Sequence, residues 1–431
     1  MTATAALLDF ASANHVLPPA ARADTLRLLG DTLAVGAAGS TAPGAAGVLA
    51  SARMAGTGGD ARLLGRADRL PAPAAAYVNG FHIHCLEWDA VHEPAVVHAL
   101  SVVTAALHAA IDRRGGCDPD DALVALAVGV DIASGLGIAA DSALRFFRPA
   151  TAGLIGAALA VARIEGLPRC QFDDVLGLAY SHCAGTMQAH VEGSIALPLQ
   201  IANAARAAVQ VVDLVRHGLT GPHNVMAGPF GYFALIDTGD FSRYTKDLGS
   251  IWRISEISTK PYPSGRASHG VLGALADLGI DAKQIERLDV AAPPLIHRLV
   301  GRPFGSDMTP AYARLCLPLL SALMLTDGRI DPRRFTPATF TDPTIAALAA
   351  KLYLTVDDNP DPNALGPQQL TAALTTGQMI HHHIPHTRGS RDAPMSAAQA
   401  TDKRDLARLL AADLADARLF DDPLAYFTEP Q

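Results

Sequence analysis

Apolar residues recur at helical spacing in one segment after another through the first half of the chain. Many of these residues are alanine, and small side chains let helices pack closely against one another. Gly, Pro or Asp residues separate the segments, as they do where helices end. The pattern therefore predicts a large all-α domain. Its helices are expected over residues 7–13, 20–37, 74–88, 95–112, 119–137, 151–165, 173–188, 197–215 and 227–236.

The pattern changes after Pro263, where helical and strand-like segments begin to alternate. Alternation of this kind predicts an α+β domain. The Gly-rich residues 44–65 predict a loop with a short strand-like fragment. Helices are expected over residues 267–278, 312–325, 342–350 and 397–419, and strands in IERLDVAAPP (285–294) and KLYLTVDD (351–358).

The chain has 431 residues, of which 49% are hydrophobic and 18% charged, so it can bury a large core and divide into two domains. Its net charge of -8 and its pI of 6.0, without a basic run, argue against a nucleic-acid partner. Residues 122–140 are long and apolar enough to suggest a membrane span. They contain Asp131 and many small residues, so we expect a buried helix of the bundle and no membrane partner.

The five cysteines are scattered and show no CxxC spacing, so neither disulfides nor a zinc site is predicted. The N-terminus lacks a basic region and Asp9 interrupts its apolar stretch, so we expect no export signal and a cytoplasmic location. The HHHIPH run at 381–386 is interpreted as a surface loop, because adjacent histidines of an extended segment point to opposite faces. No metal and no cofactor is predicted.

One polar segment interrupts the apolar pattern, HCLEWDAVHEPAVVHAL from His84 to Leu100. It carries three histidines and three acids. A helix that ends near Asp89 places His84 and Glu87 on one stripe, and Pro94 ends the helical pattern before the next helix begins. A polar kink between two apolar helices is suited to form the wall of a pocket. A solvated corner is the alternative.

Ordered motifs extend over nearly the whole chain, from Leu7 to about Phe420. In these motifs the chain resembles the MmgE/PrpD family, whose members include 2-methylcitrate dehydratase, cis-aconitate decarboxylase and iminodisuccinate epimerase. The motifs are Val78-Asn79-Gly80 and Leu86-Glu87-Trp88-Asp89, RPATAGLIGAALAVARIEGL from Arg148, GLTGPHNVMAGPFGYF up to Phe233, and TKPYPSGRASH from Thr259 to His269.

The resemblance implies a mainly α fold with an inserted lid. A large all-α helical domain of residues 1–262 and 395–431 would carry a smaller α+β lid domain of residues 263–394, inserted between its two parts. The resemblance also implies a homodimer. The implied activity is that of a cofactor-independent lyase or isomerase that abstracts a proton α to a carboxylate of a small di- or tricarboxylic acid. Dehydration, decarboxylation and epimerisation are the possible outcomes.

Such chemistry needs fixed cations for the carboxylates of the substrate and a proton-transfer group of suitable pKa. The family places a lysine at the domain junction, which implies Lys260 here, and Tyr262 is a candidate proton donor. His92 is the first choice for proton transfer because imidazole titrates near neutral pH, and Asp89 either orients it or serves as the base itself. The remaining candidates are Glu87 and His98, as alternative bases or substrate contacts, and Arg148, Gln200, Arg266 and His269, as substrate contacts.

Several positions depart from the family pattern. Ala90-Val91 stands where dehydratase and decarboxylase relatives have an acid and a hydroxyl, and Arg148 replaces a histidine. Leu197 and Gln200 replace a lysine and a histidine, and Leu319 replaces a tyrosine. A substrate or an outcome different from that of the 2-methylcitrate reaction is therefore expected.

The lost lysine and histidine favour a second hypothesis, in which the chain is a non-catalytic metabolite-binding or structural relative. His190 and Arg302 would have to compensate as cations if the chain is an enzyme. An enclosed cleft that brings His92, Lys260 and His269 together would favour the enzyme. The same residues scattered over the surface would favour the non-catalytic relative.

Overall fold

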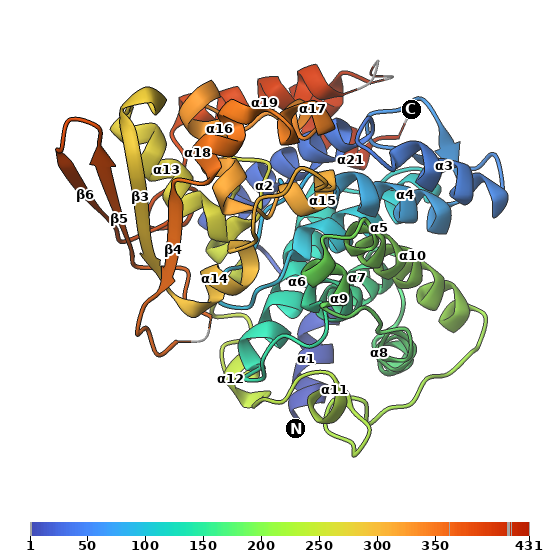
Figure 1. Cartoon of the computed structure of the whole chain (residues 1–431). Helices are drawn as coiled ribbons and strands as arrows, with labels where there is room; N and C mark the ends of the chain where they lie inside the picture. The colour runs from blue at the N-terminus through green and yellow to red at the C-terminus, as the bar shows by residue number, and fades with distance from the viewer. Residues whose placement is uncertain (1, 362, 412–413, 415, 431) are drawn as a thin grey trace.

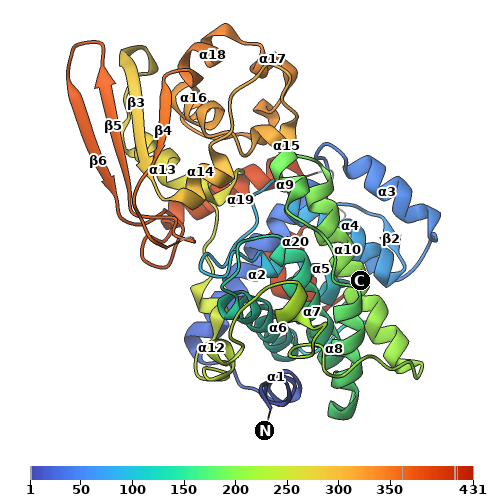
Figure 2. The same ribbon diagram turned by 60° about the horizontal axis from the view of Figure 1, so that its bottom comes forward.

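Helices make up most of the chain in the computed structural model, which describes residues 2–361, 363–411, 414 and 416–430. The prediction of a mainly α fold is confirmed. The molecule contains two separate buried hydrophobic clusters. One lies in a bundle of helices at one end, and the other lies in a four-stranded sheet and its helices at the other end (Figure 1 and Figure 2).

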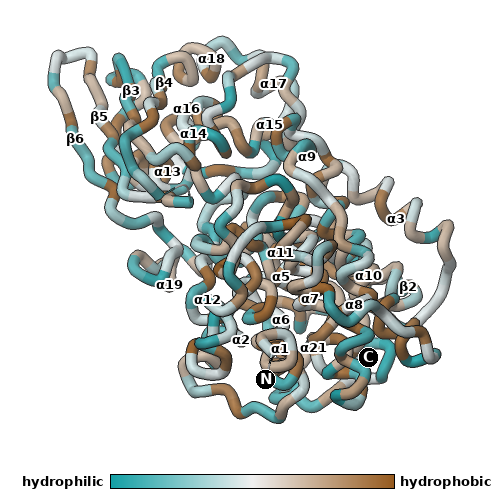
Figure 3. Tube along the Cα trace, turned by 90° about the horizontal axis from the view of Figure 1, so that it is seen from below, coloured by the Kyte–Doolittle hydropathy of each residue, from teal (hydrophilic) through white to brown (hydrophobic). Residues whose placement is uncertain are grey.

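The larger cluster fills the helical bundle. Helix α7 (Arg148–Ile164) is central because it contacts α5 (Ala99–Arg113), α6 (Pro119–Ala139) and α10 (Ala196–Arg216). Apolar stretches of the chain gather in the middle of this bundle (Figure 3). Its other elements are α1 (Ala3–Ser12), α2 (Pro19–Gly39), α3 (Ala45–Met54), α4 (Ala72–His84), α8 (Phe172–Ser181), α9 (Gln188–Glu192), α11 (Tyr232–Leu235), α12 (Ser242–Thr245) and the strand pair β1 (Ala61–Arg62) and β2 (Arg69–Leu70).

Helix α6 is long and apolar enough to cross a membrane by composition, but 94% of its most apolar window is buried inside the protein. Asp131 of this helix is buried as well, and it accepts hydrogen bonds from Tyr244 Oη (2.8 Å) and from the backbone N–H of Arg253 (2.9 Å). Burial raises the pKa of Asp131 to about 6 in spite of these bonds. Residues 122–140 thus form the buried bundle helix that the sequence predicts.

The smaller cluster is built on a mixed sheet with the strand order β4-β3-β5-β6. Strand β3 (Ile285–Ala292) pairs in parallel with β4 (Leu352–Val356) and antiparallel with β5 (Gln368–Leu374). Strand β6 (Met379–Ile384) pairs antiparallel with β5. This confirms the α+β character predicted after Pro263. The helices beside the sheet are α13 (His269–Leu278), α14 (Pro294–Val300), α15 (Pro310–Ala313), α16 (Leu317–Asp327), α17 (Pro337–Phe340) and α18 (Pro343–Ala349).

After β6 the chain returns to the bundle. Helix α19 (Ala397–Leu410) contacts α2, and so do α20 (Arg418–Asp421) and α21 (Pro423–Thr428). Lys403 of α19 places its Nζ atom 2.7 Å from Asp31 Oδ1 of α2. Both ends of the chain therefore contribute to the larger core.

The structure differs from the sequence prediction next to the polar segment. Helix α4 ends at His84 instead of residue 88, and α5 begins at Ala99 instead of residue 95. Residues 85–98 are irregular because their backbone pairs elsewhere, through Val91 with Ser258 and through His92 with Val97. The kink is therefore longer than the sequence suggests.

Other differences lie where tertiary pairing overrides local pattern. Residues 45–54 form a helix inside the predicted loop, and strand β5 was not predicted. The HHHIPH run is mostly edge strand β6 instead of a loop.

Several helices differ from their predicted bounds. The predicted helix over 173–188 ends at residue 181, the one over 227–236 is reduced to α11, and the one over 312–325 is divided into α15 and α16. The predicted helix over 397–419 becomes α19 and the start of α20, and its residues 412, 413 and 415 lie outside the described residues. Short 3-10 helices cover Arg169–Gln171, Arg253–Glu256, Arg266–Ser268, Ala282–Gln284 and Pro332–Arg334.

Close helix packing gives the first prediction. A methyl group added to Gly156 of α7 would lie 2.3 Å from the carbonyl oxygen of Gly129 on α6, which is a hard clash with backbone. Gly156→Ala should lower the free energy of unfolding by about 1–3 kcal/mol, as overpacking does. Gly47 of α3 is a matched control, since a methyl group there meets nothing within 4 Å. Gly47→Ala should instead stabilise by up to ~1 kcal/mol through helix propensity. Urea denaturation would measure both, and equal effects would contradict the packing explanation.

Candidate active site

A partly enclosed pocket of about 70 Å³ lies between the two hydrophobic clusters. The bundle contributes the segment after α4, the start of α7 and the start of α10. The sheet-containing part contributes residues around Gly265, helix α14 and Leu315. Most of the lining is apolar, as at Phe147, Leu197 and Val300. A few polar groups inside an apolar shell are typical of sites for small molecules.

An unusual backbone brings polar side chains to this pocket. Glu87 has a φ of 54° and Val96 a φ of 53°, in the left-handed region that non-glycine residues rarely adopt. The carbonyl of Glu87 accepts a hydrogen bond from Lys260 Nζ (3.0 Å), and Val91 and Ser258 exchange two backbone hydrogen bonds of 2.9 Å. Backbone strain of about 1–3 kcal/mol per residue persists only where such contacts enforce it. The second half of the chain thus holds the polar segment in its shape.

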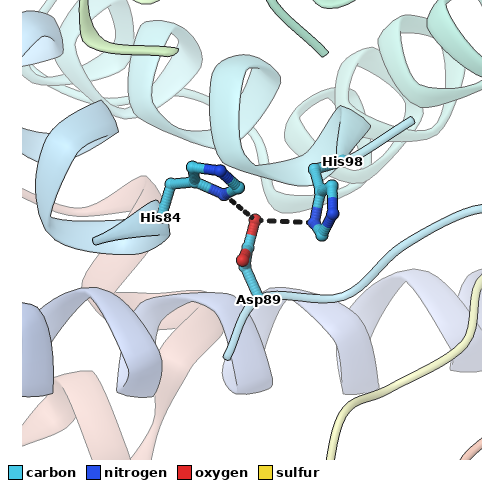
Figure 4. A group of neighbouring side chains, drawn as sticks. All are labelled: His84, Asp89 and His98. Atoms are coloured by element: carbon cyan, nitrogen blue, oxygen red, sulfur yellow. Dashed lines mark hydrogen bonds and ion pairs between the residues drawn. The ribbon is translucent and has the colours of Figure 1, made fainter. Parts of the chain in front are cut away.

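Asp89 is the centre of the polar cluster (Figure 4). Its carboxylate is fully buried, and its Oδ2 atom lies 2.9 Å from His84 Nδ1 and 3.0 Å from His98 Nδ1. Ser101 Oγ donates a short hydrogen bond to the same oxygen. Burial alone would raise the pKa of Asp89, but the two histidines hold that pKa well below its usual value. Asp89 is therefore ionised and orients both imidazoles.

The pKa values of the two histidines move in opposite directions. Burial lowers the pKa of His98, and the charge of Lys260 adds to this effect against the attraction of Asp89. Burial also disfavours the charged form of His84, but Asp89 and Glu87 outweigh it and raise the pKa of His84. At neutral pH His98 is thus neutral, while His84 is the histidine that favours the protonated form. Because its Nδ1 faces Asp89, His98 can offer Nε2 to a molecule in the pocket.

Lys260 is fully buried and lies next to Glu87. Its Nζ atom is 3.3 Å from Glu87 Oε2 and 4.0 Å from Asp89 Oδ1. Burial would raise the pKa of Glu87, but Lys260 and the two neighbouring histidines lower it to about 2. Lys260 is therefore the counter-ion of two carboxylates, and it does not itself line the pocket.

Two predicted substrate-binding arginines line the pocket but are already paired. Arg148 Nε lies 3.1 Å from Asp237 Oδ2, and Arg266 Nη2 lies 2.7 Å from Glu93 Oε1. Both arginines are buried, so each ion pair is shielded from water. The positive charge of each guanidinium is thus balanced within the protein.

His190 also lines the pocket. Burial, together with the charge of Arg302, lowers the pKa of His190 to about 4. His190 is therefore neutral at physiological pH, and it cannot replace a lost lysine as a cation. Arg302 Nη2 lies 3.3 Å from His190 Nδ1 and donates to the His190 carbonyl.

His92 and His269 do not line the pocket. His92 Nε2 lies 2.9 Å from Glu256 Oε2, and His92 Nδ1 accepts a hydrogen bond from the Ala95 N–H (3.2 Å). Both ring nitrogens of His92 are therefore occupied within the protein. His269 Nε2 lies 3.2 Å from Ser264 Oγ in a fully buried position.

Tyr262 and Gln200 also lie outside this pocket. Tyr262 lines a different cavity of about 620 Å³, together with Arg388 and Lys403. Gln200 Nε2 donates to the carbonyl of Thr186 (3.2 Å). Neither side chain is brought to the histidines around Asp89.

His92, Lys260 and His269 were expected to lie together in one cleft, but the structure does not place them there. The polar cluster at the pocket is instead built around Asp89. All three are buried instead of scattered over the surface, but only Lys260 contacts the carboxylates beside the pocket. The structure adds His84, which was not among the candidate site residues that the sequence suggested. Its signal in the sequence is the five-residue spacing to Asp89, which a turn just after a helix end can close.

His84, Asp89 and His98 are residue types that bind metal ions, and one ligand atom from each lies within 4.8 Å of the others. Both imidazoles and the hydroxyl of Ser101 converge on one carboxylate oxygen. A metal ion placed among them would have to replace these contacts. The geometry fits a hydrogen-bonded triad, and the absence of a metal from the reaction stays a prediction.

The chain belongs to the MmgE/PrpD family. Residues 7–244 match the MmgE/PrpD N-terminal domain, and residues 262–418 match the MmgE/PrpD C-terminal domain. The cis-aconitate decarboxylase of Homo sapiens is 28% identical over 308 residues, which are 66% of this chain and 62% of that protein. The cis-aconitate decarboxylase of Mus musculus is 29% identical over 321 residues, 69% of this chain and 64% of that protein.

A third relative covers more of the chain. The cis-aconitate decarboxylase-like protein oryM of Aspergillus oryzae is 25% identical over 384 residues, which are 82% of this chain and 79% of that protein. By contrast, the matched region spans less than two thirds of the human and mouse proteins, at 62% and 64% of their lengths.

The role of Lys260 as a counter-ion gives the second prediction. Lys260→Met keeps the apolar stem but leaves Glu87 and Asp89 as buried acids without their cation. The free energy of unfolding at pH 7 should fall by about 3–5 kcal/mol, as it does when one partner of a buried ion pair is removed. Adding Glu87→Gln to Lys260→Met should restore part of the loss. Lys283→Met, at an exposed lysine, should change stability by less than about 0.5 kcal/mol. Equal effects of the two lysine variants in urea denaturation would show that Lys260 is not needed as a counter-ion.

Proposed function

We propose that this protein is a lyase of the decarboxylase type that acts on a small di- or tricarboxylic acid without a metal or a cofactor. Membership of the MmgE/PrpD family and the similarity to cis-aconitate decarboxylases support the reaction class. The site suits dehydration and epimerisation as well, because all three reactions move a proton at the carbon next to a carboxylate. Cis-aconitate is accordingly the first acid to test.

One observation carries this proposal: an ionised Asp89 lies between two histidines, and both histidines line a partly enclosed pocket. His98, which is neutral, would exchange a proton with the substrate carbon through Nε2. Asp89 would stabilise the imidazolium that forms when His98 takes the proton. In a decarboxylation, the carbon–carbon bond to CO2 breaks, and the electron pair left on carbon takes a proton that His98 passes on from solvent, so His98 is neutral before and after the reaction.

The charges around the triad support the same step. Lys260 and protonated His84 would offset the charge of Glu87 and Asp89, so that an enolate-like intermediate in the pocket does not meet two uncompensated acids. Fixed charges in a water-poor pocket stabilise developing charge more strongly than water does. In this proposal Lys260 neutralises the charge of Glu87 through their ion pair and does not touch the substrate.

We further propose that residues 263–394 form a lid over a helical domain of residues 1–262 and 395–431. The pocket is lined from both sides, by His98 and Phe147 of the bundle and by Val300 and Leu315 of the sheet-containing part. Movement of one part against the other would admit the substrate and then exclude water. The competing hypothesis is a non-catalytic metabolite-binding relative, and the paired state of both wall arginines favours it.

The third prediction tests the base. In D2O with EDTA present, the protein and a panel of small acids that includes cis-aconitate should give products or recovered acids that carry deuterium on carbon. His98→Gln keeps size and hydrogen bonding but not basicity, and it should slow this labelling about 10²–10⁴-fold. His92→Gln is the matched control, because His92 is bonded to Glu256 outside the pocket, and it should label within a few-fold of the wild-type rate. NMR would follow the labelling.

Other results of this experiment have definite meanings. Loss of labelling in His92→Gln but not in His98→Gln would show that the base is His92, which was the first choice from the sequence. Labelling that EDTA abolishes and a divalent ion restores would contradict metal independence. No labelling of any acid would favour the non-catalytic relative.

The fourth prediction concerns pH. The proposed base must be neutral, and burial lowers the pKa of His98 below the ordinary histidine value of about 6.5. Activity should therefore fall only when the pH drops below that value. The charge on His84, whose pKa is raised by Asp89 and Glu87, should be lost only above the ordinary value. The profile of kcat/KM should be bell-shaped, with its maximum between these two limbs. An acid limb above pH ~7 would contradict the assignment of His98 as the base.

A further inference from the structure

A buried guanidinium stands without a counter-ion beside the pocket. Arg314 lies between α15 and α16 and is only 2% exposed. Its Nε atom has no hydrogen-bond partner, and among the described residues no acid forms an ion pair with it. Its guanidinium carbon lies 5.4 Å from the centre of the Phe335 ring. Buried charges in proteins are normally paired, so we expect an anion to bind next to this arginine.

The nearest ionisable groups do not supply that anion. Glu87 is close enough to favour the charged form of Arg314, but its carboxylate is already paired with Lys260. Cys85 is the other neighbour. Burial raises the pKa of the Cys85 thiol to about 12, so it is uncharged at physiological pH. The other buried arginines at the pocket differ, because Arg148 and Arg266 each have an acidic partner.

Arg314 lines a recess next to the main pocket. The two cavities share wall residues, namely His84, Glu87, Leu197 and Leu315. The recess holds about 10 Å³, which is room for about one water-sized atom such as a carboxylate oxygen. A ligand that reaches Arg314 must therefore keep its body in the main pocket and insert only one end.

The start of helix α10 also lines the recess. Ser194, Ile195 and Pro198 line it there. Helix α10 has 21 residues, so its N-terminus carries the partial positive charge that attracts anions. The helix and Arg314 thus both favour an anion in the recess, and the negative charge of Glu87 in the same wall is balanced by Lys260.

We propose that this recess binds one carboxylate of the substrate and that Arg314 is its counter-ion and a specificity-determining residue. A planar guanidinium matches a carboxylate in shape and charge. The ligand class is a small acid with two or more carboxylates, one of them in the recess and the reacting carbon in the main pocket. The position of the reacting carbon rests on the proposed function, whereas the binding of a carboxylate at Arg314 does not.

Binding of succinate and of succinamide tests the carboxylate site separately from the catalytic step. Succinamide has the same size but carries amides in place of both carboxylates. The wild-type protein should bind succinate more tightly, measured by thermal shift and calorimetry. Arg314→Met should weaken succinate binding ~10- to 100-fold, the effect of losing a charge-assisted hydrogen bond, and should leave succinamide binding nearly unchanged. Arg314→Lys keeps the charge and should retain part of the preference.

Stability without ligand provides an independent readout. Arg314→Met removes a buried charge that has no partner, so its melting temperature should equal or exceed that of the wild type. Arg62→Met is the matched control, because Arg62 is similarly buried but is paired with Asp112 at 2.6 Å. This control should melt at a lower temperature and keep the preference for succinate.

Three results would overturn the proposal. They are equal binding of succinate and succinamide by the wild type, an unchanged preference in Arg314→Met, and a loss of stability in Arg314→Met as large as in Arg62→Met. His98→Gln should keep the preference for succinate even though it slows proton exchange. If no acid exchanges protons but Arg314→Met still loses the preference, the proposed function fails and the carboxylate site stands.

Discussion

A buried carboxylate, that of Asp89, determines how the polar cluster is organised. Removed from water, it stays ionised because two imidazoles and a hydroxyl converge on one of its oxygens and Lys260 stands beside the other. The same contacts fix the orientation of His84 and His98. The irregular backbone after α4 follows from this arrangement, since a continued helix would carry these side chains apart.

The pocket depends on a second constraint, the meeting of two hydrophobic cores. The bundle holds the triad, residues 258–260 just before the sheet-containing part supply Lys260, and the sheet-containing part supplies the apolar wall around Leu315. Hydrogen bonds between Val91 and Ser258 join the polar segment to these residues. Because these residues lead directly into the proposed lid, movement of the lid would change the contacts that hold the polar segment and the proposed base.

Charge balance distinguishes the groups that shape the pocket from those that are available to a ligand. Arg148 and Arg266 have acidic partners, and His190 is kept neutral by burial and by Arg302. Arg314 differs from these two arginines, since its buried charge has no acidic ion-pair partner among the described residues, and it also lacks the carbonyl contact that Arg302 makes with His190. A protein keeps an unpaired charge at a cost in stability, and binding of an anion removes that cost. This contrast is why a carboxylate is assigned to Arg314 and not to the two arginines that the sequence singled out.

The sequence by itself determined the helical bundle and the polar segment. Helices α6 and α10 begin and end within two residues of their predicted bounds, because apolar periodicity and helix ends are local properties. The segment from His84 to Leu100 was recognised for the same reason. Only the tertiary structure decided which of its histidines faces the pocket, because His92 meets Glu256, a residue far along the chain. Pairing and burial depend on such distant partners, and sequence spacing carries no record of them.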